Sequence, residues 1–94
     1  MKVKFAIVGC GHIGKKHAEL VAQHLDAELV ATIDPAYEHL EILGSNVNHF
    51  QSLDDFFKQK IEVDVINICT PNGFHAEQAI QCLNQGHHVV IEKP

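Results

Sequence analysis

The sequence predicts an α/β fold: a doubly wound parallel sheet of about five strands with helices on both faces. Short apolar runs that suit buried strands alternate with segments in which apolar residues recur at helical spacing. Most of these runs are continuous rather than alternating with polar residues, which is typical of parallel strands covered on both faces. No repeat or change of composition divides the 94 residues, so we expect one domain.

The predicted strands follow one another with short connections. Their ranges are Val3–Val8, Leu29–Ile33, Val47–Phe50, Val63–Cys69 and His88–Ile91. The first helix lies between the first two strands. Its expected inner face consists of Ile13, His17, Leu20, Val21 and Leu25. A short helix is expected at Pro35–Leu43, with proline at its start and Gly44 just past its end.

Two further helices complete the alternation. Ser52 opens the first of them, and Asp55 three residues later gives a pattern like a capping box. The expected inner face of this helix is Leu53, Phe56, Phe57 and Ile61. The last helix is closed by Gly86. Its expected inner face is Ala76, Ala79, Ile80 and Leu83.

The charge of the chain restricts its partners. A net charge of −5 argues against nucleic acid and against anionic membrane surfaces. No segment of the sequence is long and apolar enough to suggest a membrane span. The chain contains no arginine, the residue that usually clamps phosphate groups side-on. A phosphate ligand would therefore be held mainly by backbone N–H groups or by lysine.

The cysteines and histidines suggest neither disulfides nor a metal site. Cys10, Cys69 and Cys82 are odd in number and widely spaced, as in a reduced cytoplasmic protein. Among the eight histidines no pair has the i, i+4 spacing of a helical zinc clamp, and no CxxC motif accompanies them. We expect no bound metal, and we expect His17 to be a packing residue on the inner face of the first helix.

The most informative motif is GCGHIG at positions 9–14, between the first strand and the first helix. In that context the GxGxxG pattern indicates a site for the diphosphate of a dinucleotide. Gly9 would permit a tight turn, Gly11 a close approach of the backbone to the diphosphate, and Gly14 close packing of helix on strand. His12 and Ile13 begin the helix, whose N-terminus offers free N–H groups and a positive dipole end.

Asp34 ends the second predicted strand, 20 positions after Gly14, which is the spacing of the dinucleotide fingerprint. Its carboxylate would accept hydrogen bonds from the adenosine ribose hydroxyls and would repel a 2′-phosphate. The sequence therefore favours NAD over NADP as cofactor. Asp34 would also suit as a cap for the helix that begins at Pro35, and the two roles are compatible.

Two later motifs carry a family resemblance. ICTPNGFHAEQA occupies positions 68–79, and GHHVVIEKP occupies positions 86–94. Together with GCGHIGKKHA and Asp34, they resemble the Gfo/Idh/MocA oxidoreductases in order and spacing, over essentially all 94 residues. This family includes glucose–fructose oxidoreductase, inositol dehydrogenases and sugar-nucleotide oxidases. Many families share the glycine motif, but its combination with TPNxxH and EKP is specific.

The resemblance implies a two-domain enzyme of a few hundred residues. Residues 1–94 would form its Rossmann-type NAD(P)-binding domain, which would be incomplete, and the substrate domain would follow it. Thr70 and Asn72 would lie along the cofactor near the nicotinamide, with His75 close behind and Glu92 near the nicotinamide ribose. Lys93 would be catalytic, reaching both the nicotinamide region and the substrate, where an ammonium stabilises a developing alkoxide.

Each of these side chains also has an ordinary structural explanation. Thr70 would cap a turn before the next proline, and His75 would only hydrogen-bond backbone groups in the first turn of its helix. Glu92 and Lys93 would be solvated residues at the end of a strand. The site roles are favoured over these explanations, most clearly for Lys93, because EKP stands in register with the other motifs.

The implied reaction is hydride transfer at a CH–OH group of a sugar, cyclitol or sugar nucleotide. The full-length protein would be a cytoplasmic homo-oligomer, and the 94-residue chain would bind cofactor without turning over substrate. The alternative is a non-catalytic NAD-binding regulatory or sensor module. Retention of Lys93 favours the enzyme, because a sensor has less use for an ammonium beside the nicotinamide.

Overall fold

The computed structural model describes residues 2–9, 11–35, 47–70 and 72–91. Within these residues the chain forms a five-stranded, entirely parallel sheet with the order β3-β2-β1-β4-β5. The strands are β1 (Val3–Val8), β2 (Ala27–Ile33), β3 (Asn48–Phe50), β4 (Val65–Ile68) and β5 (His88–Ile91). The predicted fold class is confirmed. The strand order reverses beside β1, because the chain runs outward through β2 and β3 and then returns to the other side for β4 and β5.

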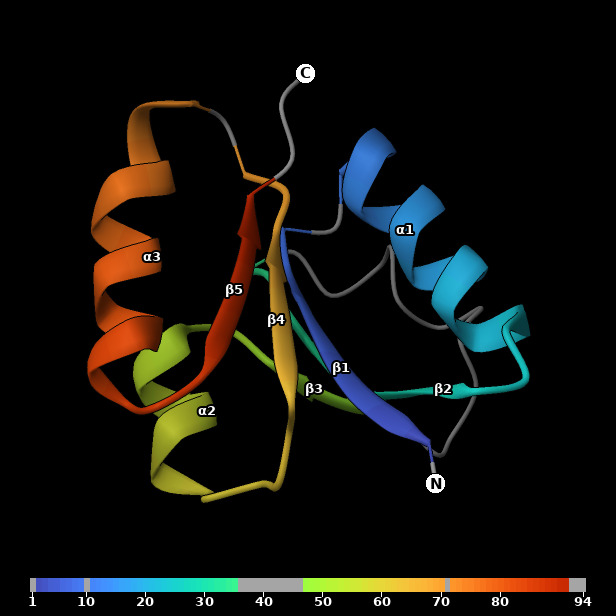
Figure 1. Cartoon of the computed structure of the whole chain (residues 1–94). Helices are drawn as coiled ribbons and strands as arrows, with labels where there is room; N and C mark the ends of the chain where they lie inside the picture. The colour runs from blue at the N-terminus through green and yellow to red at the C-terminus, as the bar shows by residue number, and fades with distance from the viewer. Residues whose placement is uncertain (1, 10, 36–46, 71, 92–94) are drawn as a thin grey trace.

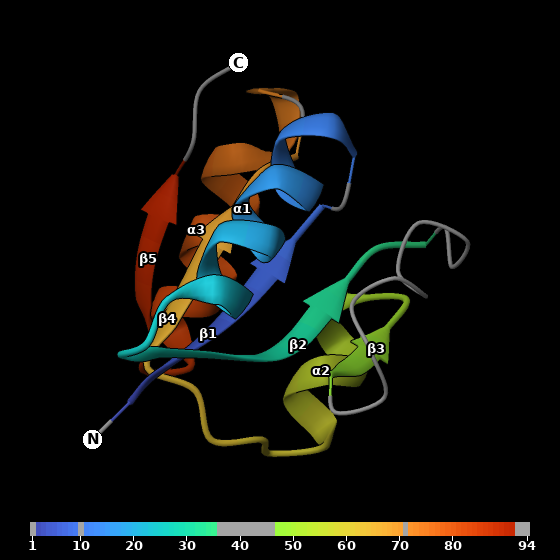
Figure 2. The same ribbon diagram turned by 90° about the vertical axis from the view of Figure 1, so that its right-hand side faces the viewer.

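Helices cover both faces of the sheet, as Figures 1 and 2 show. The helix α1 (His12–Gln23) lies on one face, and α2 (Leu53–Lys58) and α3 (His75–Asn84) lie on the other. A short 3-10 turn, η3 (Asn72–Phe74), leads into α3. In the part of the chain described, no helix combines the length and the apolar character that crossing a membrane requires.

The core has two parts because successive side chains of a strand point to opposite faces. On β1, Ala6 and Val8 belong to the larger cluster, together with Phe56 of α2 and Cys82 of α3. Ile7, between them, packs instead with Ala18 of α1 and with Leu29. Burial on both faces explains why the central strands are continuous apolar runs.

Three strands differ in their bounds from the prediction. β3 begins at Asn48, one residue later than expected. β2 begins at Ala27, two residues earlier than expected, because its first residues extend the pairing with the start of β1. β4 covers only Val65–Ile68 of the predicted Val63–Cys69. The helix predicted at Pro35–Leu43 lies outside the described residues apart from its first position. The cap predicted at Ser52 is confirmed, since its hydroxyl accepts a hydrogen bond from the Asp55 N–H at 3.2 Å.

The predicted inner faces of two helices are partly wrong. Among the side chains of α1 that the structure describes, the buried positions are Gly14 and Ala18, while Leu20 is 60% exposed. Leu25 lies beyond the end of the helix and is 87% exposed. Small residues let α1 approach the sheet closely, and this moves its larger side chains to the flanks.

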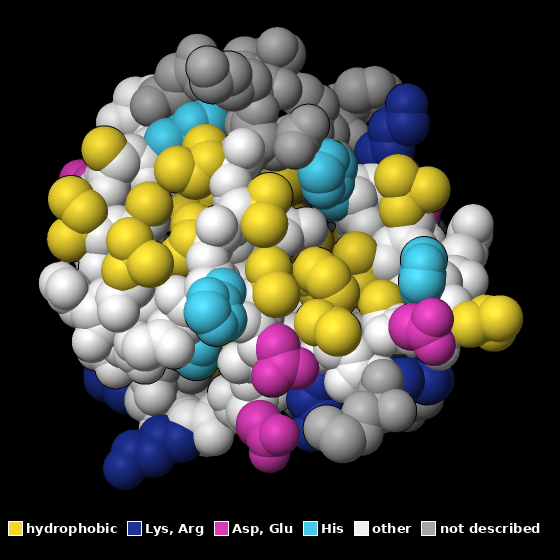
Figure 3. All heavy atoms as spheres, viewed as in Figure 1, with side chains coloured by type: hydrophobic (Ala, Val, Ile, Leu, Met, Phe, Trp, Pro, Cys, Tyr) yellow, Lys and Arg dark blue, Asp and Glu magenta, His cyan; other side chains and the backbone are white. Residues whose placement is uncertain are grey.

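In α3, too, the larger apolar side chains are not the buried ones. Its buried residues are His75, Ala79 and Cys82, at positions i, i+4 and i+7, while Ile80 and Leu83 are exposed. Ala76 is exposed as well. Hydrophobicity and helical spacing favoured Ile80 and Leu83, but the row that packs on the sheet consists of the smaller or more polar His75, Ala79 and Cys82. Figure 3 shows hydrophobic side chains gathered on the face that carries β5.

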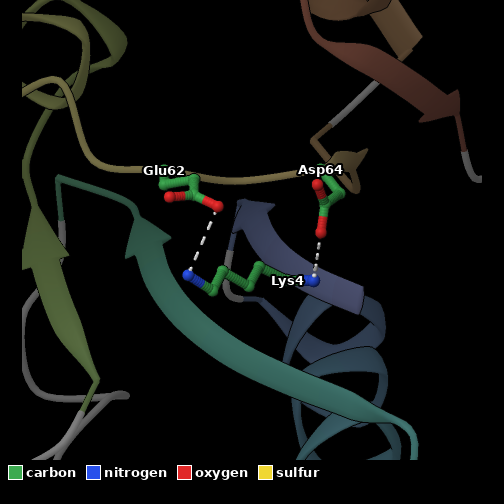
Figure 4. Close-up of polar contacts among 3 residues, drawn as sticks. All are labelled: Lys4, Glu62 and Asp64. Atoms are coloured by element: carbon green, nitrogen blue, oxygen red, sulfur yellow. Dashed lines mark hydrogen bonds and ion pairs between the residues drawn. The ribbon is translucent and has the colours of Figure 1, made fainter. Parts of the chain in front are cut away.

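The register of β4 against β1 is fixed by Asp64 and Lys4, whose contacts are drawn in Figure 4. The Asp64 carboxylate accepts a hydrogen bond from the Lys4 backbone N–H at 2.8 Å, and the Asp64 N–H donates to the Lys4 carbonyl at 2.8 Å. The Lys4 ammonium also lies 3.6 Å from the Glu62 carboxylate, but Glu62 is 81% exposed, so this pair contributes little. These two hydrogen bonds between Lys4 and Asp64 precede the pairing of Phe5 with Val65.

Lys60 gives a test of the backbone conformation that ends α2. It follows the C-cap Gln59 and has a φ of 51°, a left-handed conformation that costs an L residue free energy. We expect Lys60→Gly to raise the free energy of unfolding by about 0.5–1 kcal/mol, measured by urea denaturation. The control is Lys60→Ala, which removes the same charge but keeps the Cβ. Equal effects of the two variants would contradict this account.

Candidate functional site

The carboxyl ends of the strands enclose a hollow of about 390 Å³. Gly9, Asp34 and Thr70, which follow β1, β2 and β4, all line it. The other lining residues are Val8, Ile33, Pro35, Gln51, Ser52, Leu53, Asp54, Phe74, Glu77, Gln78 and Gln81. The hollow therefore lies beside the position where the strand order reverses, which is where open parallel sheets bind their ligands.

The turn after β1 has the geometry that its glycines predict. Gly9 has a φ of +88°, and a Cβ built on it would lie 2.7 Å from the Thr70 methyl carbon. A Cβ on Gly14 would lie only 1.7 Å from the Gly9 carbonyl oxygen. The predicted tight turn and close packing are confirmed. A Cβ on Gly11 would meet nothing within 4 Å, so this side of the turn is open.

The N-terminus of α1 is available to a ligand. Its N-cap is Gly11, which has an extended conformation and makes no side-chain cap hydrogen bond. The first N–H groups of a helix have no partner within the helix, and the positive end of the helix dipole adds to their attraction for anions. The backbone of His12 and Ile13 begins α1, while their side chains lie outside the described part.

Asp34 is half-buried at the end of β2, and its N–H donates to the Phe50 carbonyl at 2.9 Å. The neighbouring residue on β3, His49, has its Nδ1 3.0 Å from the Thr32 hydroxyl. Burial lowers the pKa of His49, and hydrogen bonding to the Asp34 backbone and the charge of its carboxylate oppose that shift. The Asp34 carboxylate therefore lies within electrostatic reach of the half-buried His49 imidazole.

Thr70 contacts the opposite side of the glycine turn. Its carbonyl accepts a hydrogen bond from Nε2–H of His75, which is 9% exposed. Its hydroxyl donates to Oε1 of Gln78. His75 thus makes the backbone hydrogen bond that the sequence left open, and it lies behind Thr70, outside the set of residues that line the hollow. Its expected proximity to a nicotinamide stays a prediction.

Three other predicted site residues have no described side chain. The backbone of Asn72 lies in the turn η3, but its side chain falls outside the description. Glu92 and Lys93 lie outside the described residues altogether. The structure thus brings together Gly9 of the glycine turn, Asp34 and Thr70 around one hollow. The cofactor and catalytic roles of all the predicted site residues stay predictions.

Two segments of the wall of the hollow were not predicted from the sequence. One is Gln51–Asp54, which follows β3 and begins α2. The other is a row on and before α3, consisting of Phe74, Glu77, Gln78 and Gln81. The row was visible in the sequence as the positions i, i+3, i+4 and i+7 that share one face of a helix. Three of the described lining residues are acidic, namely Asp34, Asp54 and Glu77, and none is basic.

Neither metal nor thiol chemistry is indicated by the described residues. They contain no group of three His, Cys, Asp or Glu side chains that could hold a metal ion. Burial raises the pKa of Cys82 to about 11, so its thiol stays protonated at neutral pH. Cys69 is half-buried and packs at the edge of the smaller core cluster.

The comparisons with known proteins agree with this geometry. A family model described as an oxidoreductase family with an NAD-binding Rossmann fold, Gfo/Idh/MocA, matches residues 3–94. The chain belongs to this family. Its relatives include D-glucoside 3-dehydrogenase of Escherichia coli, which is 34% identical over 95 residues, covering 98% of the chain and 27% of that protein.

Two solved structures of the Gfo/Idh/MocA type are also similar. Scyllo-inositol dehydrogenase from Lactobacillus casei, with bound NAD(H) and scyllo-inositol, is 35% identical with a TM-score of 0.88, covering 100% of the chain and 28% of that protein. The WlbA dehydrogenase from Bordetella pertussis, in complex with NADH and UDP-GlcNAcA, is 40% identical with a TM-score of 0.87, covering 100% and 29%. The chain thus spans less than a third of each of these relatives.

The lowered pKa of His49 predicts a pH dependence of folding. The folded state binds this proton less readily than the unfolded chain, whose histidine has a pKa near 6.5, so stability is lost as the pH falls below that value. We expect His49→Gln to reduce the loss of unfolding free energy between about pH 7.5 and about pH 5.5, measured by urea denaturation. The same change at the exposed His88 is the control. An unchanged loss in His49→Gln would contradict the burial argument.

Proposed function

We propose that this chain is the cofactor-binding domain of an NAD-dependent dehydrogenase that acts on a CH–OH group of a sugar, cyclitol or sugar nucleotide. The observation that carries the proposal is the meeting of an uncapped glycine turn with Asp34 in one hollow at the carboxyl ends of the strands. Membership of the oxidoreductase family supports it. The inositol and UDP-sugar in the two related structures support the substrate class.

The diphosphate of the cofactor would be bound mainly by the backbone. The chain has no arginine, and the described wall of the hollow contains no basic side chain. The open side of Gly11 leaves room for a phosphate near the first N–H groups of α1. This arrangement needs no cationic side chain, since aligned amides and the helix dipole together attract the anion.

The acidic wall favours NAD over NADP. Asp34 would accept hydrogen bonds from the ribose hydroxyls, and Asp54 and Glu77 add two further carboxylates around the same hollow. The 2′-phosphate of NADP would bring its own negative charges into this field without a described cation to balance them. The expected preference for NAD thus follows from repulsion as well as from hydrogen bonding.

The bound nicotinamide would supply the hydride chemistry, and the residues of this chain would bind and orient it. Thr70 and Asn72 would lie along the cofactor, and Glu92 would lie near its ribose. The Lys93 ammonium would donate a hydrogen bond to the reacting hydroxyl and stabilise the charge that develops there. The substrate pocket and subunit contacts would be formed by residues beyond those of this chain, so we expect cofactor binding without turnover.

The ribose role of Asp34 is tested by calorimetric titration with both dinucleotides. The wild-type chain should bind NAD more tightly than NADP. Asp34→Ala should raise the Kd for NAD by about 10- to 100-fold, the usual range for losing hydrogen bonds to a charged group. The Kd for NADP should change by less, because the same substitution also removes a repulsion.

The matched control is Asp26→Ala, which removes one exposed carboxylate at the opposite end of β2. It should leave both affinities within about twofold of the wild type. Equal weakening of NAD and NADP by Asp34→Ala would refute the ribose contact. Failure of the wild-type chain to bind either dinucleotide would refute the proposed cofactor site.

A further inference from the structure

Thr70 is held at two points by one face of α3. His75 and Gln78 are three positions apart, so their side chains lie on the same side of the helix. His75 donates from Nε2–H to the Thr70 carbonyl, and Gln78 accepts from the Thr70 hydroxyl through Oε1. The main chain and the side chain of Thr70 are therefore both fixed by the same element.

The hydrogen bond to Gln78 determines where the Thr70 methyl group lies. A threonine side chain has few rotamers, and fixing its hydroxyl also fixes its methyl. In this rotamer the Thr70 Cγ2 lies against the glycine turn, only 2.7 Å from the position that a Cβ on Gly9 would occupy. The methyl group thus packs on the residue whose left-handed conformation makes the turn.

The same hydrogen bond determines whether the Thr70 hydroxyl can donate to a ligand in the hollow or only accept from it. A hydroxyl has one hydrogen to donate and two lone pairs that accept. Because the hydrogen is used by Gln78, the Thr70 oxygen offers only acceptor capacity to a ligand. Thr70, Gln78 and Gly9 all line the hollow, so this hydrogen-bond acceptor lies at the candidate cofactor site.

We propose that Gln78 is a positioning residue of the cofactor site that acts through Thr70. It holds the Thr70 methyl against the glycine turn and makes the Thr70 hydroxyl an acceptor for a hydroxyl or N–H donor of the cofactor, rather than a donor to a phosphate oxygen. The proposal rests on the proposed cofactor function.

A double-mutant cycle on the Kd for NAD tests the proposal. Gln78→Met keeps the length of the side chain and its helix propensity but removes the acceptor. We expect it to weaken binding by about three- to tenfold, as the loss of one hydrogen bond does, and Thr70→Val to weaken it at least as much. The double variant should be no weaker than Thr70→Val alone, because Gln78 has no hydroxyl left to orient. Gln85→Met, an exposed change at the far end of α3, should leave the Kd unchanged.

A second measurement does not depend on the dinucleotide. Three-bond NMR couplings of the ligand-free chain report the χ1 angle of Thr70. We expect a single rotamer in the wild type and in Gln85→Met, and an average of rotamers in Gln78→Met. Thermal unfolding of each variant in the absence of ligand verifies that the chain remains folded.

Two results would overturn the proposal. One is an unchanged single rotamer in Gln78→Met, and the other is a double variant whose loss equals the product of the two single losses. If the wild-type chain bound no dinucleotide, the proposed function would fail, while the couplings would still decide whether Gln78 orients Thr70. The two failures are therefore distinguishable.

Discussion

The site depends on one contact, in which the start of α1 lies directly on the turn that ends β1. A Cβ at Gly14 would sit 1.7 Å from the Gly9 carbonyl oxygen, a distance that no side chain can satisfy. This absence of a side chain lets α1 begin close beside the end of β1. The first N–H groups of α1 are thereby held beside the turn whose Gly9 lines the hollow into which β2 and β4 also lead.

The glycine turn is confined from the other side by Thr70. Cys69 and Thr70, which follow β4, lie against the turn, so the two halves of the sheet meet at the position where the strand order reverses. Asp34 belongs to one half, while Thr70 and Gln78 belong to the other. A ligand in the hollow would contact both halves, which explains why this position is the usual site of dinucleotide binding in such sheets.

The sequence predicted those features that depend on local pattern or fixed spacing. The GxGxxG turn and Asp34 were found because strand, turn and helix are consecutive in the chain, and the parallel sheet followed from buried apolar runs. The inner faces of α1 and α3 were assigned partly wrongly, because Leu20 and Ile80 match the helical period as well as the small residues that pack on the sheet. The spacing of Gln78 places it on one face of a helix, but that this face and Gln51–Asp54 line the hollow depends on tertiary packing, which no local pattern specifies.

We infer that backbone amides of this turn bind the diphosphate of a dinucleotide. The most direct test is an NMR titration of the ¹⁵N-labelled chain with NAD. The account predicts saturable shifts that are largest for the amides of Gly9, Gly11 and the first turn of α1, followed by Asp34 and Thr70. Unchanged resonances for these amides at saturating NAD, or shifts centred on the opposite end of the sheet near Asp26 and His87, would contradict it.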